Sequence, residues 1–341
     1  MSPKVSIVLP FRNEEKYLQA CMASILDQTF KNWELIAVDD YSTDQSVSII
    51  NQFVIHDKRV KYYKNPSRGL VSALNYGISQ SQSPLIARMD GDDLMDSQRL
   101  SHQVSHLRKS PDIGVVASQV IHFPRATGKQ RKGYELHVQW TNSILNAEDH
   151  SLNRFIDCPF AHPSVTFRKS LVDKFGGYTD GSFPEDFELW LRWMSKGVSM
   201  EKIPKPLLSW RDYPERASRT DKRYAVSEFQ KIKAKYVRKW IKNDANLCER
   251  KILCWGAGRV ARKFFTLLNK EGVNISGFLD PDPKKVGKQI ASLPILPIIK
   301  LPAPKKTFIL ILASARGARE QTTQYLKDHG YIFGKDFLPL A

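Results

Sequence analysis

Three acidic segments of this chain have residue types and spacings that suit cation binding or proton transfer. The first is Asp90-Gly91-Asp92-Asp93, which follows the apolar run 84–89. A divalent cation bound to a diphosphate needs only one or two protein carboxylates, because phosphate oxygens and water fill the other positions. Two acids one residue apart at a strand end could therefore divide the work between a sugar hydroxyl and the metal. The simpler alternative is an Asp-Gly turn that caps the next helix.

The second acidic segment is Asp39-Asp40, which ends the apolar run 34–38 and precedes 42–44. Either Ser42 or Asp44 could cap the following helix alone, so capping does not require two adjacent aspartates. We therefore expect one carboxylate here to accept the imide N–H of a uracil or thymine ring. Capping remains the alternative.

The third acidic segment is Glu185-Asp186, and Pro184 suits the first turn of the helix predicted to start here. The apolar residues that follow have the i, i+3, i+4, i+7 spacing of a helix with one buried face: Phe187, Trp190, Leu191 and Met194. A helix dipole favours ionised carboxylates at this end, and such a carboxylate can act as a general base. Alternatively, the acids only complement the dipole of a surface helix.

Strands and helices alternate along the first half of the chain. Four short apolar runs predict strands: 5–9, 34–38, 59–63 and 84–89. Helical patterns separate them, so we expect a doubly wound α/β sheet. Ligands of such sheets bind beyond the carboxyl ends of the strands. Those ends carry 10–13, Asp39-Asp40 and Asp90–Asp93, which predicts one shared site.

Composition limits the class of protein. The chain has 341 residues and four scattered cysteines, which suggests two domains without a disulfide framework or zinc ribbon. No apolar run approaches the roughly 18 residues of a membrane span. The first residues also lack the pattern of a secretion signal, so we expect a cytoplasmic protein.

The net charge of +17 raises nucleic acid as a partner, but its distribution argues against one. Residues 1–221 carry a net charge of only +2, and most of the excess lies in 222–242 and 249–341. Segment 222–248 is expected to be a basic linker helix that packs on a domain, or else one that lies peripherally on an anionic membrane at the inner face. Its apolar residues have near-helical spacing: Phe229, Ile232, Tyr236, Trp240 and Ile241.

A second α/β pattern starts at the predicted strand 251–255. Gly256-x-Gly258-x-x-Ala261 follows it, and Asp280 comes about twenty residues later, which fits a dinucleotide fingerprint. The segment also looks like the small Rossmann-like domain of sugar O-acyltransferases. A hydride-transfer enzyme needs a substrate domain as well, so we favour a nucleotide or sugar-phosphate binding module, or a docking surface, with its ligand unknown.

Together, the segments of the first 220 residues resemble the family 2 glycosyltransferases, which are inverting enzymes with the GT-A fold. The matching segments, in order, are 5–14, 24–30, 38–44, 68–75, 89–93, 162–164, 176–178 and 185–192. The resemblance implies a GT-A nucleotide-diphospho-sugar transferase domain over 1–221, with a nucleotide half (1–110) and an acceptor half (111–221). The basic linker 222–248 and a small Rossmann-like α/β domain (249–341) would follow.

The resemblance also implies a nucleotide-diphosphate sugar donor, usually a uridine one, and a divalent metal, Mn²⁺ or Mg²⁺. Carried over by position, Asp92 would bind the metal and Asp186 would take the proton from the acceptor hydroxyl. The residues placed around the nucleotide and its sugar are Pro10, Arg12, Glu14, Asp40, Arg68 and Asp90. The candidates for the acceptor side and the closing loop are His162, Glu185 and Arg211.

Departures from the family pattern narrow the expected reaction. Arg12 stands where many members have Tyr, and the stretch after the last helix lacks the usual His, which leaves Arg211 or Arg216 for loop closure. The Gln-x-x-Arg-Trp element of processive synthases is absent. We therefore expect transfer of a single hexose-type sugar to a hydroxyl of a glycan or lipid-linked acceptor.

Two other functions remain open. One is a nucleotide-sugar binding protein without catalysis, which would bind a donor but not turn it over. The other is a nucleotidyltransferase, which would release pyrophosphate from a nucleoside triphosphate. The Glu185-Asp186 helix and the lack of a Gly/Arg/Lys-rich phosphate loop near the first strand argue against the second.

Overall fold

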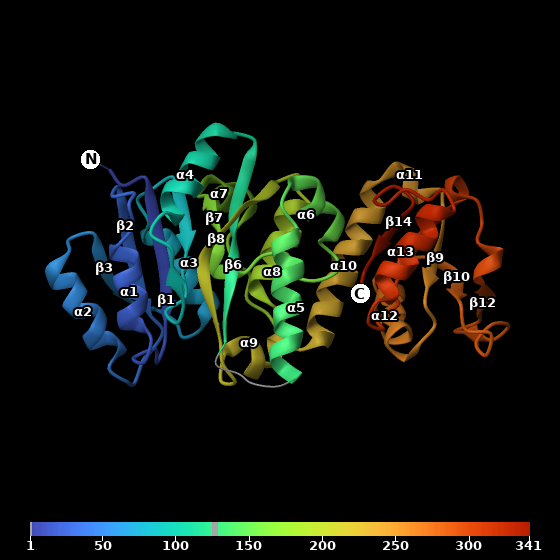
Figure 1. Cartoon of the computed structure of the whole chain (residues 1–341), viewed down its shortest axis with the longest axis horizontal. Helices are drawn as coiled ribbons and strands as arrows, with labels where there is room; N and C mark the ends of the chain where they lie inside the picture. Colours follow the sequence, from blue (N-terminus) through green and yellow to red (C-terminus); the bar gives the residue numbers. More distant parts are fainter. Residues whose placement is uncertain (1, 125–128) are drawn as a thin grey trace. The chain divides into compact units, whose positions relative to one another are not determined.

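The computed structural model of the chain describes residues 2–124 and 129–341. They form two compact units (Figure 1). Unit 1 comprises the residues up to His150 together with Cys158–Tyr224, and unit 2 comprises Ser151–Asp157 and Ala225–Ala341. The helix expected as a linker within 222–248 therefore belongs to unit 2, as does a short segment from the middle of the chain.

Unit 1 is built on an eight-stranded mixed sheet with the order β3-β2-β1-β4-β7-β6-β8-β5 (Figure 1). The first four strands in this order are parallel, whereas β7 runs antiparallel to both its neighbours. This arrangement confirms the predicted doubly wound mixed sheet. The strands are β1 (Val5–Phe11), β2 (Trp33–Asp39), β3 (Val60–Lys64), β4 (Leu85–Arg88), β5 (Leu94–Met95), β6 (Ile113–Pro124), β7 (Thr166–Arg168) and β8 (Ser199–Asp212).

Helices cover both faces of this sheet because the side chains of its central strands alternate between two cores. Val5, Ile7 and Leu9 of β1 share a core with the buried side chains of α1. On the other face, a Cβ added to Gly77 of α3 would stand only 2.7 Å from Val8. The helices up to residue 224 are α1 (Leu18–Leu26), α2 (Ser46–His56), α3 (Leu70–Gln80), α4 (Arg99–Lys109), α5 (Lys129–Ser143), α6 (Ala147–Asn153), α7 (Ser170–Phe175), α8 (Glu185–Met194) and α9 (Ala217–Thr220).

The loops after β1 and β2 are bonded to each other. Asn13 has a φ of 55°, and its side-chain oxygen accepts a hydrogen bond of 2.8 Å from the backbone nitrogen of Thr43. The backbone nitrogen of Glu14 donates to the Ser46 hydroxyl at 2.8 Å. These bonds hold the two loops together at the edge of the sheet where ligands of this fold class bind.

Unit 2 contains a six-stranded sheet with the order β11-β12-β10-β9-β13-β14, parallel except for β11. Chain order reverses between β9 and β13, the kind of switch point at which such sheets bind ligands. The apolar run 307–313 forms a strand only as far as Ile311. The strands are β9 (Lys251–Trp255), β10 (Ile275–Asp280), β11 (Gln289–Ile290), β12 (Leu293–Pro297), β13 (Thr307–Ile311) and β14 (Phe337–Pro339). The helices are α10 (Val226–Asn243), α11 (Ala245–Cys248), α12 (Arg259–Lys270) and α13 (Ala318–Asp328).

The apolar stripe of the basic segment is packed inside unit 2. Ile232, Tyr236 and Ile241 of α10 are at most 5% exposed, and the ring of Trp240 lies 5.4 Å from that of Phe308. This stripe is thus part of a protein core. No helix within residues 2–124 and 129–341 combines the length and apolarity needed to cross a membrane.

Candidate active site

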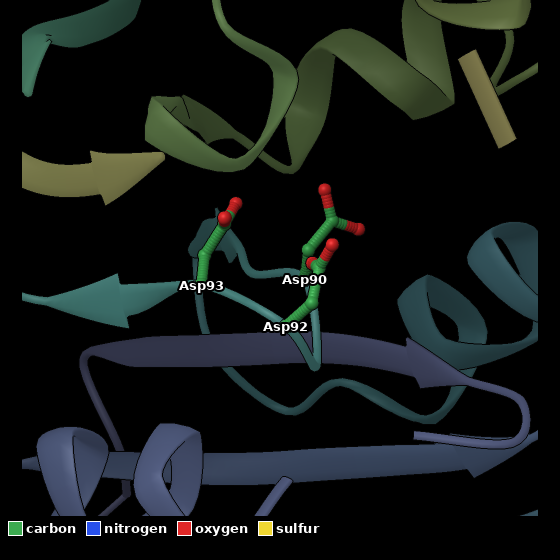
Figure 2. Close-up of side chains that lie close together, drawn as sticks. All are labelled: Asp90, Asp92 and Asp93. Atoms are coloured by element: carbon green, nitrogen blue, oxygen red, sulfur yellow. The ribbon is translucent and has the colours of Figure 1, made fainter. Parts of the chain in front are cut away.

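Three carboxylates gather in the turn that follows β4. Oxygen atoms of Asp90, Asp92 and Asp93 lie within 4.8 Å of one another, and the three side chains point to the same side of the turn (Figure 2). Strand β4 pairs in parallel with β1 at the centre of the sheet. Its carboxyl end therefore carries the turn to the ligand-binding edge, as the sequence predicted.

Burial and mutual repulsion disfavour the ionised forms of Asp92 and Asp93. Burial, with the charge of Asp92, raises the pKa of Asp93 well above its usual value. Burial also raises the pKa of Asp92, although the charge of Arg216 opposes it. Glu14 joins the group: burial, with the charges of Asp92 and Asp90, raises its pKa to about 9. A divalent cation would relieve this concentration of negative charge.

Two buried arginines already supply part of the compensating charge. Arg88 forms an ion pair with Asp90, and Arg216 lies 3.8 Å from the second carboxylate oxygen of Asp90. The Arg216 guanidinium also donates to the Tyr134 hydroxyl at 2.7 Å and lies 4.7 Å from the ring of Trp210. Residues of α5 and β8 thus hold Arg216 beside the acidic turn.

Arg211, a predicted loop candidate, is bonded to the backbone and side chains of this turn. Its backbone nitrogen donates to Asp93 at 2.7 Å, and its Nε donates to the carbonyl of Asp92 at 2.6 Å. The guanidinium lies 4.5 Å from the ring of Tyr17 and 4.8 Å from that of Phe123. Arg211 therefore shapes the acidic turn, and closure of Arg211 over a diphosphate stays a prediction.

The donor set of the turn fits Mg²⁺ or Mn²⁺. Both cations prefer hard oxygen ligands such as carboxylates. Within the described part of the chain, Oδ2 of Asp93 is buried and has no hydrogen-bond partner, so it is available as a ligand. The sequence assigned only Asp92 to the metal, and the structure brings Asp93 to the same place.

Glu185 and Asp186 occupy the first turn of α8, as predicted. Pro184 was expected inside this turn, but its ψ of 117° is extended, and it is the residue just before the helix. The backbone nitrogen of Phe187 donates to Asp186 Oδ1 at 2.7 Å. Burial, with the charge of Glu185, raises the pKa of Asp186 to about 7. Asp186 is still partly exposed, so it can reach a substrate and exchange a proton at neutral pH.

Glu185 has a different environment from its neighbour. It is 1% exposed, and the Tyr224 hydroxyl donates to both of its carboxylate oxygens at 2.9 Å. Arg223 lies 3.8 Å from Glu185 Oε2. Burial raises the pKa of Glu185, and these partners oppose the rise. Glu185 is therefore fixed inside the protein, whereas Asp186 is partly exposed.

His162 is buried in the same region. Burial, with the charges of Arg88 and Arg216, lowers the pKa of His162 well below its usual value, so the ring is neutral. Its Nε2 is 2.6 Å from the Tyr178 hydroxyl oxygen. The unprotonated nitrogen of a neutral ring can accept a hydrogen bond from this hydroxyl. The negative charges of Asp90 and Glu185 both interact with the Arg88 guanidinium. Arg88 therefore connects the two acidic centres electrostatically.

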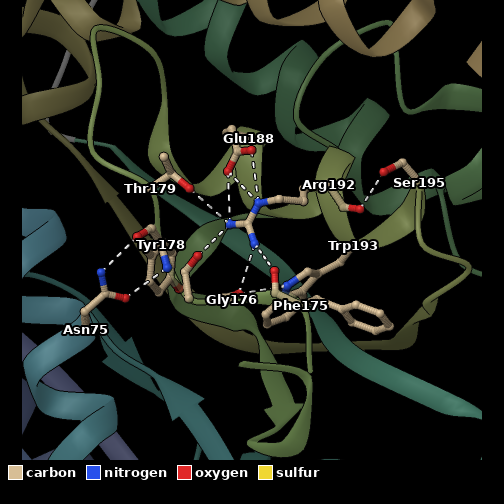
Figure 3. Close-up of polar contacts among 10 residues, drawn as sticks. Asn75, Phe175, Gly176, Tyr178, Thr179, Glu188, Arg192, Trp193 and Ser195 are labelled. Atoms are coloured by element: carbon tan, nitrogen blue, oxygen red, sulfur yellow. Dashed lines mark hydrogen bonds and ion pairs between the residues drawn. The ribbon is translucent and has the colours of Figure 1, made fainter. Parts of the chain in front are cut away.

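Arg192 of α8 holds the loop that carries Tyr178 (Figure 3). Its guanidinium donates to the carbonyls of 175–177 at 2.5, 3.0 and 2.5 Å, and Glu188 accepts from the same group at 3.1 Å. On the other side, the Asn75 side chain bonds to the backbone oxygen and nitrogen of Tyr178 at 2.8 and 2.9 Å. Helices α8 and α3 thus clamp this loop.

The residues predicted to bind the nucleotide lie around the ends of β1 and β2. Pro10 is buried in β1, whereas Arg12 and Arg68 are exposed. Asp40 is 7% exposed, and its Oδ1 accepts a 2.7 Å hydrogen bond from the backbone nitrogen of Gly69. Asp40 thus anchors the start of α3, a task that the sequence did not suggest, and its recognition of a base stays a prediction.

Sequence reasoning did not include several residues that complete the site. Arg88 carried a usable signal, because it is a charged residue inside the apolar run 84–89, at the end of a central strand. Asp93 was visible in the motif but had no assigned role. Tyr134 and Tyr224 gave no signal, because only the tertiary fold brings them to Arg216 and Glu185.

Comparisons with known proteins identify the family of the chain. A sequence model described as Glycosyl transferase family 2 matches residues 6–176. The chain is 30% identical over 239 residues, 69% of its own length and 83% of the relative, to a UDP-Gal:alpha-D-GlcNAc-diphosphoundecaprenol beta-1,3-galactosyltransferase of Escherichia coli. It is 29% identical over 210 residues, 61% of its length and 79% of the relative, to the O-antigen biosynthesis glycosyltransferase WbnJ of Escherichia coli.

Among solved structures, S. aureus TarS 1-349 in complex with UDP shares the fold, with a TM-score of 0.54 and 16% sequence identity. The match covers 71% of this chain and 66% of the TarS chain. The fold of unit 1 is the GT-A fold. The chain belongs to glycosyl transferase family 2 and is a glycosyltransferase.

Proposed function

We propose that this enzyme moves a single hexose-type sugar from a uridine diphosphate sugar to a hydroxyl of a glycan or lipid-linked acceptor, with inversion at the anomeric carbon. The observation that carries the proposal is the presence of two acidic centres with different environments, both within electrostatic reach of Arg88. The Asp90–Asp93 turn concentrates carboxylates that suit a cation-bound diphosphate. Asp186 is a partly exposed carboxylate whose raised pKa, about 7, suits a base.

In this proposal Asp186 takes the proton of the acceptor hydroxyl while its oxygen attacks the anomeric carbon from the side opposite the diphosphate. One displacement of this kind inverts the carbon. Arg88 and Arg216 both form ion pairs with Asp90, and they would stabilise the negative charge that develops on the departing diphosphate. The pKa of about 7 lets Asp186 release its proton again at neutral pH.

Asp92 and Asp93 would hold Mg²⁺ or Mn²⁺, and Asp90 would approach the ribose or the donor sugar. When bound, such an ion stabilises the negative charge of the leaving diphosphate. Glu14 lies close enough to feel the charges of Asp90 and Asp92, so it would contribute to the negative field that attracts the cation. His162 and Tyr178 would line the acceptor side as a neutral hydrogen-bonded pair.

The relatives support an acceptor in polysaccharide assembly. One is named for transfer to a diphosphoundecaprenol-linked sugar and another for O-antigen biosynthesis. We extend this to a cytoplasmic enzyme that meets lipid-linked precursors at the inner membrane face. Lys231, Lys235 and Lys239 are exposed on α10 and would contact anionic headgroups. Unchanged partitioning to anionic vesicles after neutralisation of these three lysines would contradict the membrane contact.

A donor panel tests the reaction. Binding and hydrolysis of UDP-galactose, UDP-N-acetylglucosamine and GDP-mannose would be measured with and without Mn²⁺, for the native chain and for Asp186→Asn. We expect metal-dependent turnover of one UDP-sugar, at least 100-fold slower in Asp186→Asn with donor binding retained. The matched control is Asp112→Asn, an exposed aspartate of the same unit directly before β6.

The same panel separates the alternative functions. Donor binding without turnover, and without an effect of Asp186→Asn on any rate, would indicate a binding protein that lacks catalysis. Release of pyrophosphate from a nucleoside triphosphate would indicate a nucleotidyltransferase. Turnover that survives in Asp186→Asn would remove Asp186 as the base and leave the glycosyltransferase class unchanged.

A further inference from the structure

We propose that Cys158 is a positioning residue for the base, because its thiol donates a hydrogen bond to Oδ2 of Asp186 and thereby orients and supports the ionised carboxylate. The inference rests on the proposed role of Asp186. The Sγ of Cys158 lies 3.7 Å from Asp186 Oδ2. The backbone nitrogen of Phe187 binds the other oxygen at 2.7 Å. The carboxylate is thus held from two sides.

The thiol has a second acceptor within reach. Its Sγ is 3.4 Å from the backbone carbonyl oxygen of Phe160. A thiol has one proton, so it can serve only one of these two oxygens at a time. When Asp186 is ionised, the carboxylate is the stronger acceptor. When Asp186 has taken a proton, the thiol can turn to the Phe160 carbonyl, and the carboxyl no longer needs this donor.

A buried lysine fixes the segment that presents the thiol. Lys202 is 3% exposed, and its Nζ donates to the carbonyls of Pro159, at 3.0 Å, and Thr141. Pro159 lies between Cys158 and Phe160. The bond from Lys202 therefore holds in place both the Cys158 thiol and the Phe160 carbonyl that can accept its proton. This burial lowers the pKa of Lys202 to about 7.

The other groups around Asp186 come from several elements. Glu185 on the same helix disfavours its ionised form, and Arg88 at the end of β4 favours it. The hydroxyls of Tyr178 and Tyr224 also lie within electrostatic reach of Asp186. Among these neighbours, Cys158 contacts Asp186 Oδ2 directly. Removal of its donor should therefore move the titration of the base without removing the base.

The test is the pH profile of kcat/KM for donor hydrolysis in the full chain, with the nucleotide sugar that the panel above selects. The native enzyme should lose activity as the pH falls through about 7. In Cys158→Ala the midpoint should move up by roughly half to one pH unit. Cys158→Ser keeps a donor and should restore the native midpoint or lie below it. Cys254→Ala, which removes a buried cysteine of unit 2, should leave the midpoint unchanged.

Alkylation supplies a readout without turnover. An ionised Asp186 opposes loss of the thiol proton, so iodoacetamide should label Cys158 several-fold faster in Asp186→Asn than in the native chain, as followed by mass spectrometry of its peptide. Equal labelling rates, or a Cys158→Ala midpoint equal to the native one, would overturn the inference. Full turnover in Asp186→Asn would instead overturn the proposed base, and the labelling result would still decide whether the thiol contacts Asp186.

Discussion

The backbone nitrogen of Arg211 donates a 2.7 Å hydrogen bond to the carboxylate of Asp93, a residue 118 positions earlier in the chain. The bond joins the end of β8 to the acidic turn after β4. Because both atoms are buried, loss of either partner would leave the other without compensation. The shape of the acidic turn therefore depends on β8 as well as on β4.

The acidic turn predicts a metal-dependent gain in stability. Mn²⁺ at about 100 times its dissociation constant should stabilise the native chain by about 2.7 kcal/mol. Asp92→Asn should lose most of this gain, because it removes a carboxylate from a group whose oxygens lie within 4.8 Å of one another. Differential scanning calorimetry with and without Mn²⁺ measures the effect. Asp112→Asn, an exposed aspartate of the same unit, should keep the full gain, and an equal loss there would indicate nonspecific binding.

The raised pKa of Asp186 predicts that its ionised carboxylate lowers the stability of the folded protein at and above neutral pH. Its pKa is about 7 in the fold, against 3.8 as the ordinary value. The folded state therefore holds a proton that the unfolded chain has lost between about pH 4 and pH 7, so stability falls across this window as the pH rises. Asp186→Asn, which carries no charge, should be more stable than the native chain at pH 8 by roughly 1–3 kcal/mol.

Chemical denaturation at two pH values checks this sign. The advantage of Asp186→Asn should be present at pH 8 and should be mostly lost near pH 3, where the native carboxyl is largely protonated in both states. Asp180→Asn, whose side chain is exposed, should show no such pH-dependent difference. A native chain that is more stable than Asp186→Asn at pH 8 would show that Asp186 is stabilised as a carboxylate in the fold.

Local sequence patterns predicted those parts of the site whose residues all lie in one continuous segment of the chain. The apolar run before Asp90 and the helical spacing after Glu185 each identify an element and the residue at its end, so the acidic turn and the start of α8 were predictable. Contacts between distant segments were not. Arg216 reaches Asp90 and Tyr134 only because β8, β4 and α5 meet, and no local spacing encodes that meeting.

Arg192 predicts a test of the loop that carries Tyr178. Arg192→Lys should destabilise unit 1 by roughly 2–4 kcal/mol, because one ammonium cannot serve the three carbonyls of 175–177 and Glu188 together. Hydrogen exchange of 175–179 should rise in the same variant. Lys196→Ala, at an exposed position just after the same helix, should change stability by about 0.5 kcal/mol or less. Slow exchange of the loop in Arg192→Lys would show that Asn75 and Trp193, whose Nε1 donates to the Gly176 carbonyl at 3.2 Å, hold it without Arg192.

The two glycines after β9 predict opposite outcomes for the same substitution. Gly256 has a φ of 105°, and an added Cβ would stand 3.1 Å from the backbone nitrogen of Ala313. Gly258 has an ordinary φ of −74°, precedes α12, and has no atom within 4 Å of such a Cβ. Gly256→Ser should therefore destabilise unit 2 by about 1–3 kcal/mol, because the backbone would be strained and the new side chain would clash with Ala313, which follows β13.

Gly258→Ser should be neutral or slightly stabilising, because serine is a favourable residue at the start of a helix. Hydrogen exchange of β9 and β13 localises both effects to unit 2, whereas a melting curve of the whole chain would mix the two units.

The contrast separates two reasons for glycine in this loop, a requirement of the fold and close approach of a ligand to the backbone. Gly256 is required by the fold itself, so its presence needs no bound phosphate to explain it. Gly258 leaves open space at the start of α12, so only a ligand that approaches this backbone would make its serine variant costly. Equal destabilisation by both variants would contradict this division.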